Sequence, residues 1–253
     1  MEFALILSLL ASSLCGVPSG YRLVWSDEFE GNSIDSSKWG YDIVNGGRRD
    51  NELEYYTNSE QNSYVQDGVL HIKAIKESSE GNKYTSARLI TEGKFEFQFG
   101  YVEARIALPI GQGIWPAFRL IGNYKSPGWP ACGEIDIVEA RNTENEVLAT
   151  CHWLYGGHLY HTSRSNNFDI TQFHTYFLYW DKEYIRVGID DNQYYELLIR
   201  DGISGTGAFL QNKFSFILNV AVGGNWPGFT IDDGQFPNEM KVDYIRVYQP
   251  ENN

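Results

Sequence analysis

The stretch that most constrains this chain is residues 133–140, Gly-Glu-Ile-Asp-Ile-Val-Glu-Ala, which carries three carboxylates within six residues. Its β-branched residues at alternate positions are typical of a strand. Side chains two apart in a strand share a face, so Glu134 and Asp136 point the same way. In a regular strand Glu139 would point to the apolar face, where an unpaired charge is costly. A β-bulge near Ile137–Val138 removes this conflict, because its extra residue returns Glu139 to the acidic face; we predict that bulge.

Three carboxylates on one face also suggest a chemistry. Like charges a few ångströms apart raise one another's pKa, so one group tends to hold a proton while another stays ionised. That division suits glycoside hydrolysis with retention, which uses an ionised nucleophile and a protonated acid roughly 5–5.5 Å apart. An acidic strand surface without a catalytic role, and a metal site, are alternatives that this stretch alone leaves open.

The acidic stretch, together with Gly-Trp-Pro-Ala-Cys at residues 128–132, resembles the signature of glycoside hydrolase family 16. The resemblance is to the laminarinase (endo-β-1,3-glucanase) branch, which has the six-residue, bulged form of the motif, and it covers nearly all of residues 21–249. It implies that Glu134 is the nucleophile, Asp136 its helper and Glu139 the general acid/base.

Length and composition favour one all-β domain. The chain has 253 residues, of which 42% are hydrophobic and 15% aromatic, and no stretch of 12 or more shows clear helical periodicity. We therefore predict two antiparallel sheets, in a single domain over residues 19–253. The alternation of Phe95, Phe97 and Phe99 with polar residues predicts a half-buried strand. The resemblance implies a concanavalin-like β-sandwich jelly roll, whose concave sheet forms a substrate cleft.

Residues 3–14 form an apolar run that fits the core of a signal peptide and is too short to span a bilayer. Although Glu2 stands where a positive charge is usual, we predict a signal peptide over residues 1–18 and a secreted protein, with an ordered N-terminal strand as the alternative. The net charge of −13 argues against nucleic acid or anionic membranes as partners. We expect a monomer in which Cys132 and Cys151 are buried thiols rather than a disulfide.

Aromatic and polar residues near the acidic strand are candidates for binding sugar, since a pyranose packs its C–H face on an aromatic ring. The predicted substrate-binding residues are Asn45, Arg88, Trp115, Trp129, His152, Trp153, Asn225 and Trp226. For most of them an ordinary core or loop role is the alternative. Arg119 stands where most family members have Trp, which removes a stacking plane or a core contact.

The resemblance also implies a structural Ca²⁺ remote from the cleft, held by the backbone carbonyls of Glu28 and Gly68 and the carboxylate of Asp243. Oxygen donors of this kind suit Ca²⁺, although water or sodium could fill the same place. No cofactor is implied for catalysis.

The function that follows is a secreted, retaining endo-glycosidase that hydrolyses β-1,3-glucan by double displacement. The first alternative is a non-catalytic β-1,3-glucan recognition module, which the intact set of carboxylates disfavours. The second is a family 16 transglycosylase, or a hydrolase acting on mixed-linkage glucan or a galactan. A purely structural wall protein is disfavoured, because it would not need three carboxylates on one face.

Overall fold

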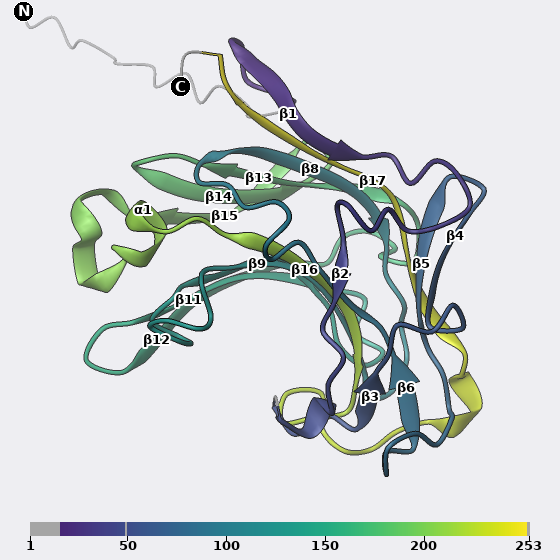
Figure 1. The fold of residues 1–253 in the computed structure, drawn as a ribbon. Coiled ribbons are helices and arrows are strands. Elements are labelled where there is room, and N and C mark those ends of the chain that lie inside the picture. Colours follow the sequence, from purple (N-terminus) through teal and green to yellow (C-terminus); the bar gives the residue numbers. More distant parts are fainter. Residues whose placement is uncertain (1–15, 49, 252–253) are drawn as a thin grey trace, which may run out of the picture.

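A computed structural model describes residues 16–48 and 50–251 of the chain. Two antiparallel sheets lie face to face, as Figure 1 shows. The predicted signal peptide falls almost entirely on residues 1–15, which lie outside the described residues. In the described ranges, the helices lack the length and apolarity that crossing a membrane would require.

The first sheet, here the β17 sheet, has the order β15-β14-β13-β8-β17-β5-β4, with β1 also paired to β17. Its strands are β1 (Tyr21–Asp27), β4 (Ser63–Gln66), β5 (Val69–Ala74), β8 (Gly100–Ala107), β13 (His174–Trp180), β14 (Tyr184–Ile189), β15 (Asn192–Leu198) and β17 (Asn238–Pro250).

The second sheet, here the β10 sheet, has the order β12-β11-β10-β9-β16-β7-β2. Its strands are β2 (Gly40–Tyr41), β7 (Arg88–Ile90), β9 (Ile114–Ile121), β10 (Glu134–Glu139), β11 (Val147–Leu154), β12 (His158–Ser165) and β16 (Ser215–Val222). A small parallel pair joins β3 (Glu54–Tyr56) to β6 (Tyr84–Ser86). The helical segments are η1 (Gly46–Arg48), η2 (Arg200–Gly205), α1 (Ala208–Gln211) and η3 (Asp233–Gln235).

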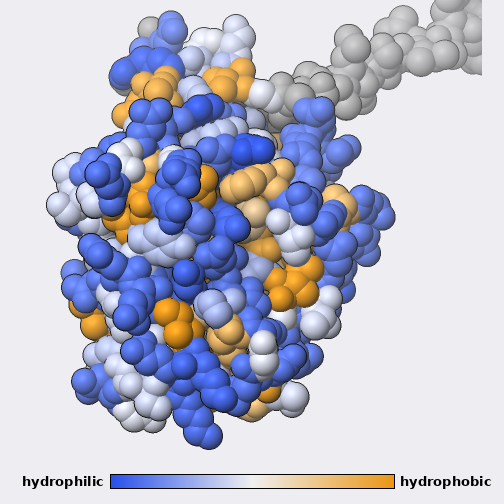
Figure 2. Space-filling model, turned by 90° about the vertical axis from the view of Figure 1, so that its right-hand side faces the viewer, coloured by the Kyte–Doolittle hydropathy of each residue, from blue (hydrophilic) through white to orange (hydrophobic). Residues whose placement is uncertain are grey.

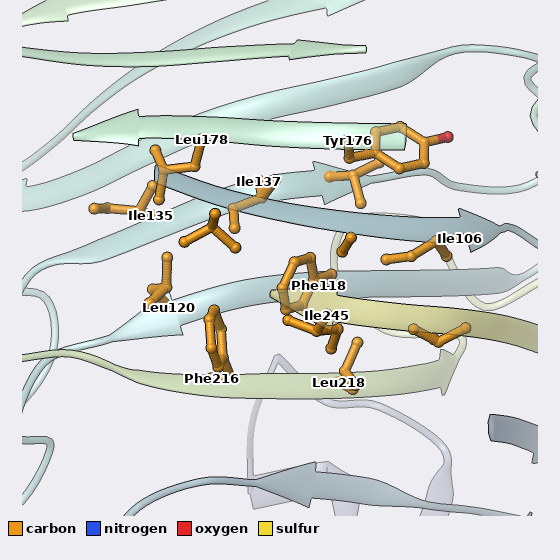
Figure 3. Close-up of a cluster of buried hydrophobic side chains, with 14 of the residues drawn as sticks. Ile106, Phe118, Leu120, Ile135, Ile137, Tyr176, Leu178, Phe216, Leu218 and Ile245 are labelled. Atoms are coloured by element: carbon orange, nitrogen blue, oxygen red, sulfur yellow. The ribbon is translucent and has the colours of Figure 1, made fainter. Parts of the chain in front are cut away.

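The two sheets bury their facing side chains against each other, and this confirms the predicted all-β sandwich. Ile135 and Ile137 of β10 point toward the other sheet and lie near Leu178 of β13, as Figure 3 shows. On the face drawn in Figure 2, hydrophilic side chains predominate and apolar ones occur in small separate groups. Burial of apolar area between the sheets is therefore the main stabilising contribution to this fold.

The predicted β-bulge in β10 is confirmed. Asp136 pairs with Arg119 and Val138 with Phe118, so Ile137 is an extra residue opposite β9. On the other side, the register with β11 shifts between Asp136 and Glu139. Ile137 and Val138 are both fully buried in the core. The bulge thereby turns two successive apolar side chains inward and returns Glu139 to the face of the other carboxylates.

The strand predicted over residues 95–99 is wrong, although its aromatic residues do pack in or against the core. Only Phe97 makes a bridge, to Phe214, and its ring is buried among aromatic neighbours. The backbone at Phe99 has a φ of 59°, in the left-handed region, so the chain turns there before β8 begins at Gly100.

The prediction of free thiols is confirmed in the described part of the chain. Cys132 and Cys151 are both buried and neither forms a disulfide. Burial raises the pKa of each thiol, to about 11 for Cys132, which keeps both protonated and unreactive at neutral pH.

Candidate active site

The candidate site lies on the side of the β10 sheet that faces away from the core. Its side chains come from alternate positions of four adjacent strands, as the pleat requires. They line a cleft of about 500 Å³, within the usual range for a small-molecule site. The strands contribute Trp115 and Arg119 from β9, Glu134 and Glu139 from β10, Thr150 and His152 from β11, and His158, Tyr160, Thr162 and Arg164 from β12.

Arg119 contacts all three carboxylates of β10. It lies directly across the β9–β10 ladder from Asp136, so its side chain emerges between those of Glu134 and Glu139. Its Nη1 donates to Glu134 Oε1 at 3.1 Å and its Nη2 to Glu139 Oε1 at 2.9 Å. Its Nε lies 3.4 Å from Asp136 Oδ1. One guanidinium therefore joins the three acidic groups into a single network.

Two indole N–H groups hold the outer carboxylates from the other side. Trp129 Nε1 donates to Glu134 Oε2 at 2.6 Å, and Trp115 Nε1 donates to Glu139 Oε1 at 3.0 Å. The ring of Trp115 also meets Trp226 edge to face, with centroids 5.2 Å apart. These two hydrogen bonds, added to those from Arg119, fix each carboxyl group in one orientation.

A row of imidazoles leads from the third carboxylate to the surface. His152 Nε2 lies 3.3 Å from Asp136 Oδ2, and His152 Nδ1 is 2.9 Å from His158 Nε2. Asp136 itself is only 1% exposed, and among the described residues neither of its oxygens has a hydrogen-bond partner of good geometry. Its carboxylate thus lies between two cationic groups, Arg119 on one side and His152 on the other.

The two outer carboxylates have opposite pKa shifts. Burial disfavours ionisation of Glu134, but the charges of Arg119 and His152 and the hydrogen bond from Trp129 outweigh it and lower its pKa. Burial, together with the charge of Asp136, raises the pKa of Glu139 to about 8. At neutral pH one carboxylate is therefore ionised and the other protonated.

The pKa values of Asp136 and His152, in the middle of the network, are also shifted. Burial and the adjacent charge of Glu134 raise the pKa of Asp136. Burial disfavours the cationic form of His152, yet its interaction with Asp136 outweighs this and raises the imidazole pKa to about 9. His152 is accordingly an imidazolium at neutral pH and partly neutralises the acidic strand.

Comparison with known proteins decides the family. A model of glycosyl hydrolases family 16 matches residues 50–246. The chain belongs to glycoside hydrolase family 16. Hydrolases of this family need no catalytic cofactor, in keeping with a site built from carboxylates.

Individual relatives in family 16 match over most of this chain. It is 43% identical to the clotting factor G alpha subunit of Tachypleus tridentatus, across 95% of this chain but only 36% of that protein. It is 37% identical to the laminarinase of Rhodothermus marinus, with a TM-score of 0.83, across 90% of this chain and 97% of that one. It is 38% identical to SCLam, a non-specific endo-β-1,3(4)-glucanase of the family, with a TM-score of 0.85, across 93% of each chain. A variant of SCLam was crystallised with 1,3-β-D-cellobiosyl-glucose at its active site.

Most of the residues predicted to bind substrate do reach this family 16 cleft. Trp115, Trp129, His152 and Trp226 line it. Arg88 lines an adjoining hollow of about 230 Å³, which shares Arg119, Trp129 and Glu134 with the cleft. The guanidinium of Arg88 also donates to Asp42 and Asn219, so it supports the floor of the hollow.

The structure does not place the other three predicted residues in the cleft. Trp153 lies in the core, where its Nε1 donates to the carbonyl of Ser204, because it follows His152 and so occupies the opposite face of β11. The amide of Asn45 donates to Asn82 and accepts from the Gly47 N–H.

Asn225 has an indirect connection to the cleft. Its backbone N–H donates to the carbonyl of Asp50, and its Oδ1 accepts from Asn51. Asp50 lines the cleft, whereas Asn225 is not among the described residues that line it. Asn225 therefore holds in place the segment around Asp50, which forms one wall of the cleft.

Sequence analysis missed the wall formed by β12. His158, Tyr160, Thr162 and Arg164 alternate along this strand and all line the cleft. The signal was present as a period of two, but both faces of β12 are exposed over most of its length. An edge strand of this kind lacks the apolar alternation that makes strands recognisable.

The residues predicted to hold Ca²⁺ belong to or adjoin β1, β5 and β17 of one sheet, and the Ca²⁺ site stays a prediction. β1 and β5 pair with successive parts of one edge of β17, through Asp27↔Ile245 and Leu70↔Val242. Glu28 follows Asp27, and Gly68 comes two residues before Leu70. Both positions therefore come beside Asp243, where the register of β17 with β8 shifts. Two carbonyls and a carboxylate fit Ca²⁺ in donor type.

The side chains at this place already have partners. Asp243 Oδ2 accepts from Arg105 Nη1 at 2.6 Å, and the carboxylate of Glu28 binds Arg246. Within the described residues, no group of three or more His, Cys, Asp or Glu side chains could hold a metal. A cation at this place would therefore rely on backbone oxygens and water for most of its ligands.

Proposed function

We propose that this chain is a retaining endo-glycosidase that hydrolyses β-1,3-glucan. The observation that carries the proposal is the placement of Glu134 and Glu139 on one cleft floor, joined through Arg119. Their surroundings lower the pKa of Glu134 and raise that of Glu139 to about 8. Retaining hydrolysis requires this pair. Both groups belong to the same strand, so the rigid sheet fixes their separation.

In the first step of the proposed reaction, a Glu134 oxygen attacks the anomeric carbon while Glu139 gives its proton to the departing glycosidic oxygen. The glycosidic C–O bond breaks and an ester to Glu134 forms. In the second step Glu139, now ionised, takes a proton from water, and the resulting hydroxyl displaces Glu134 from the sugar. Both carboxyl groups return to their starting protonation states. Asp136 adjusts the ionisation of Glu134 through its own charge.

The shape of the cleft supports action within a chain rather than at its end. The main cleft extends over β12, β11, β10 and β9, and the adjoining hollow continues it toward Arg88 on β7. A binding surface that crosses so many strands can hold several sugar units on both sides of the carboxylates. Exposed Trp129 and Tyr160 provide apolar ring faces along this route.

The choice of β-1,3-glucan rests on the relatives. The laminarinase of Rhodothermus marinus matches along nearly its whole length, and SCLam is named for action on β-1,3(4)-glucan. The rival reading as a non-catalytic recognition module lacks support from the site, because both predicted reacting carboxylates are present and their surroundings shift their pKa values in opposite directions. Action on a mixed-linkage glucan is the rival that the SCLam similarity favours.

The test is release of reducing ends from laminarin, lichenan and agarose, with product anomers followed by NMR. We expect the fastest release from laminarin and early formation of the β-anomer. Early α-anomer would contradict retention. Binding of laminarin without release from any polymer would establish the recognition module instead, and release from lichenan alone would keep the mechanism and change the substrate.

We also propose that the protein is secreted after removal of residues 1–18. The apolar run at residues 3–14 supports this. A polymeric glucan is too large to enter a cell intact, so an enzyme that cuts it internally is useful outside. The mature N-terminus can be read by sequencing the protein from culture medium.

A structural Ca²⁺ beside Asp243 is a further part of the proposal. If the ion binds only the folded state, its removal by EGTA is expected to lower the melting midpoint by roughly 5–10 °C. Asp243→Asn is expected to abolish the difference between EGTA-treated and Ca²⁺-supplemented protein. Equal midpoints of the wild type with and without chelator would contradict a structural ion.

A further inference from the structure

Arg119 joins the three carboxylates of β10 to Trp115 on the cleft floor. Its side chain is 12% exposed, and its two Nη atoms donate to different carboxylates. Its guanidinium also lies 5.6 Å from the ring centre of Trp115, whose indole binds Glu139. Two independent contacts therefore connect Arg119 to Glu139.

The charges of the site balance only when Arg119 is counted. In the protonation state that the proposed reaction needs, Glu134 and Asp136 are ionised and Glu139 is neutral. Arg119 and the imidazolium of His152 supply two positive charges, so the cluster has no net charge. Without Arg119, two buried carboxylates would face one cation, and burial of the excess negative charge would favour uptake of a proton.

Other charged groups lie further out around this cluster. Asp50, Arg141 and Arg164 line the cleft, with His158 on β12 between His152 and the solvent. Glu52 and Arg88 line the adjoining hollow. Most of these groups border open cleft, where water screens their charge; Arg119 contacts the carboxylates directly.

We propose that Arg119 is a positioning residue, which fixes Glu134 and Glu139 relative to each other and keeps Glu134 ionised. The expected effects on hydrolysis rest on the proposed function. The expected effects on the pKa values of Glu134 and Glu139 rest only on the hydrogen bonds of Arg119. The forked guanidinium is essential to it, because an ammonium group has no rigid pair of donors that could reach both carboxylates at once.

The kinetic test compares Arg119→Met, which keeps a long side chain but removes the charge, with Arg119→Lys. Arg119 favours the ionised form of every carboxylate it contacts, so its loss raises their pKa values. Both limbs of the pH profile of kcat/KM on laminarin should then move to higher pH in Arg119→Met, by roughly one unit. The maximum should fall by about 10²-fold, because the two groups lose their fixed separation.

Arg119→Lys separates charge from geometry. It should keep the pH profile close to that of the wild type while losing much of the rate. Arg186→Met, on β14 of the other sheet, makes the same chemical change at an ion pair with Glu196 and should leave the profile unchanged. A rate loss in Arg119→Met with no shift of either limb would overturn the proposal, since a purely structural role predicts that result.

A second measurement needs no substrate. The indole N–H groups of Trp129 and Trp115 donate to Glu134 and Glu139, so their ¹⁵N NMR signals report the protonation of each carboxylate. The chain has seven Trp, and Trp→Phe variants assign the two signals. We expect both titration midpoints to rise by roughly one unit in Arg119→Met; unchanged midpoints would overturn the proposal. This result stands even if the wild type hydrolyses none of the polymers, in which case only the proposed function fails.

Discussion

Replacing Glu134 by Gln is expected to lower kcat on laminarin by roughly 10³-fold or more, since an amide cannot form the glycosyl ester. The substitution also disturbs the cleft floor in a specific way. Trp129 and Arg119 donate to different oxygens of Glu134, and Gln offers only one acceptor. One of these donors must then face the amide NH₂ group and loses its acceptor, which further disturbs the position of the side chain.

The measurement is the initial rate of reducing-end release, with thermal unfolding recorded for the same preparation. Glu196→Gln on β15 is the matched control, because it changes the same functional group on the other sheet, where Glu196 binds Arg186. Its rate should equal that of the wild type. A Glu134→Gln protein that unfolds normally and hydrolyses laminarin at near wild-type rate would rule out Glu134 as nucleophile.

The arrangement of the three carboxylates could be predicted from sequence because it depends on local rules. Glu134 and Asp136 share a face through the strand period of two. Glu139 is out of phase with them, and only a bulge avoids burying its charge among apolar side chains. The observed register shift lies at the predicted place. The cost of a buried charge was thus sufficient to predict an irregularity in the backbone.

The same period of two explains the error at Trp153. His152 points to the cleft and contacts Asp136, so its neighbour must point to the core, where Trp153 contacts Phe209. Both residues were predicted to bind substrate, but the pleat allows only one of them to reach it. Applying the strand period of two to β11 as strictly as to β10 would have excluded Trp153 from the predicted substrate-binding residues.

The role of Arg119 could not be predicted, because it depends on how strands pair. In the sequence, Arg119 is notable only because it stands, between Phe118 and Leu120, where most family members have Trp. Its place opposite Asp136 follows from the β9–β10 register, which a single sequence does not specify. Once that register is known, the contacts with all three carboxylates follow from the length and fork of the guanidinium.

The second large effect is expected for Glu139→Ala, and it should depend on the leaving group. On laminarin the departing sugar oxygen needs a proton, so loss of the acid should lower the rate by roughly 10²–10⁴-fold. A 2,4-dinitrophenyl β-glycoside of a laminari-oligosaccharide releases a stable anion that needs no proton. Its first step should therefore proceed at near wild-type rate, giving a rapid burst of dinitrophenolate.

The same variant should then stall, because the ester on Glu134 must be cleaved by water that no base activates. Azide needs no base, so adding it should restore turnover and yield a glycosyl azide of β configuration. Glu196→Ala serves as the control and should respond to neither the leaving group nor azide. Equal losses on laminarin and on the aryl glycoside would show that Glu139 acts on binding or folding rather than on proton transfer.

The pH profile gives an independent check on the same group. Glu139 must carry a proton in the first step, and its pKa of about 8 means that this proton is held below that pH and lost above it. For wild type on laminarin, kcat/KM should therefore decline as the pH rises through about 8. Glu139→Ala acting on the aryl glycoside has no such proton to lose, so its burst rate should show no alkaline decline. If the decline persists in that variant, another group controls it, and the assignment of Glu139 as the acid fails even though its position on the bulge is correct.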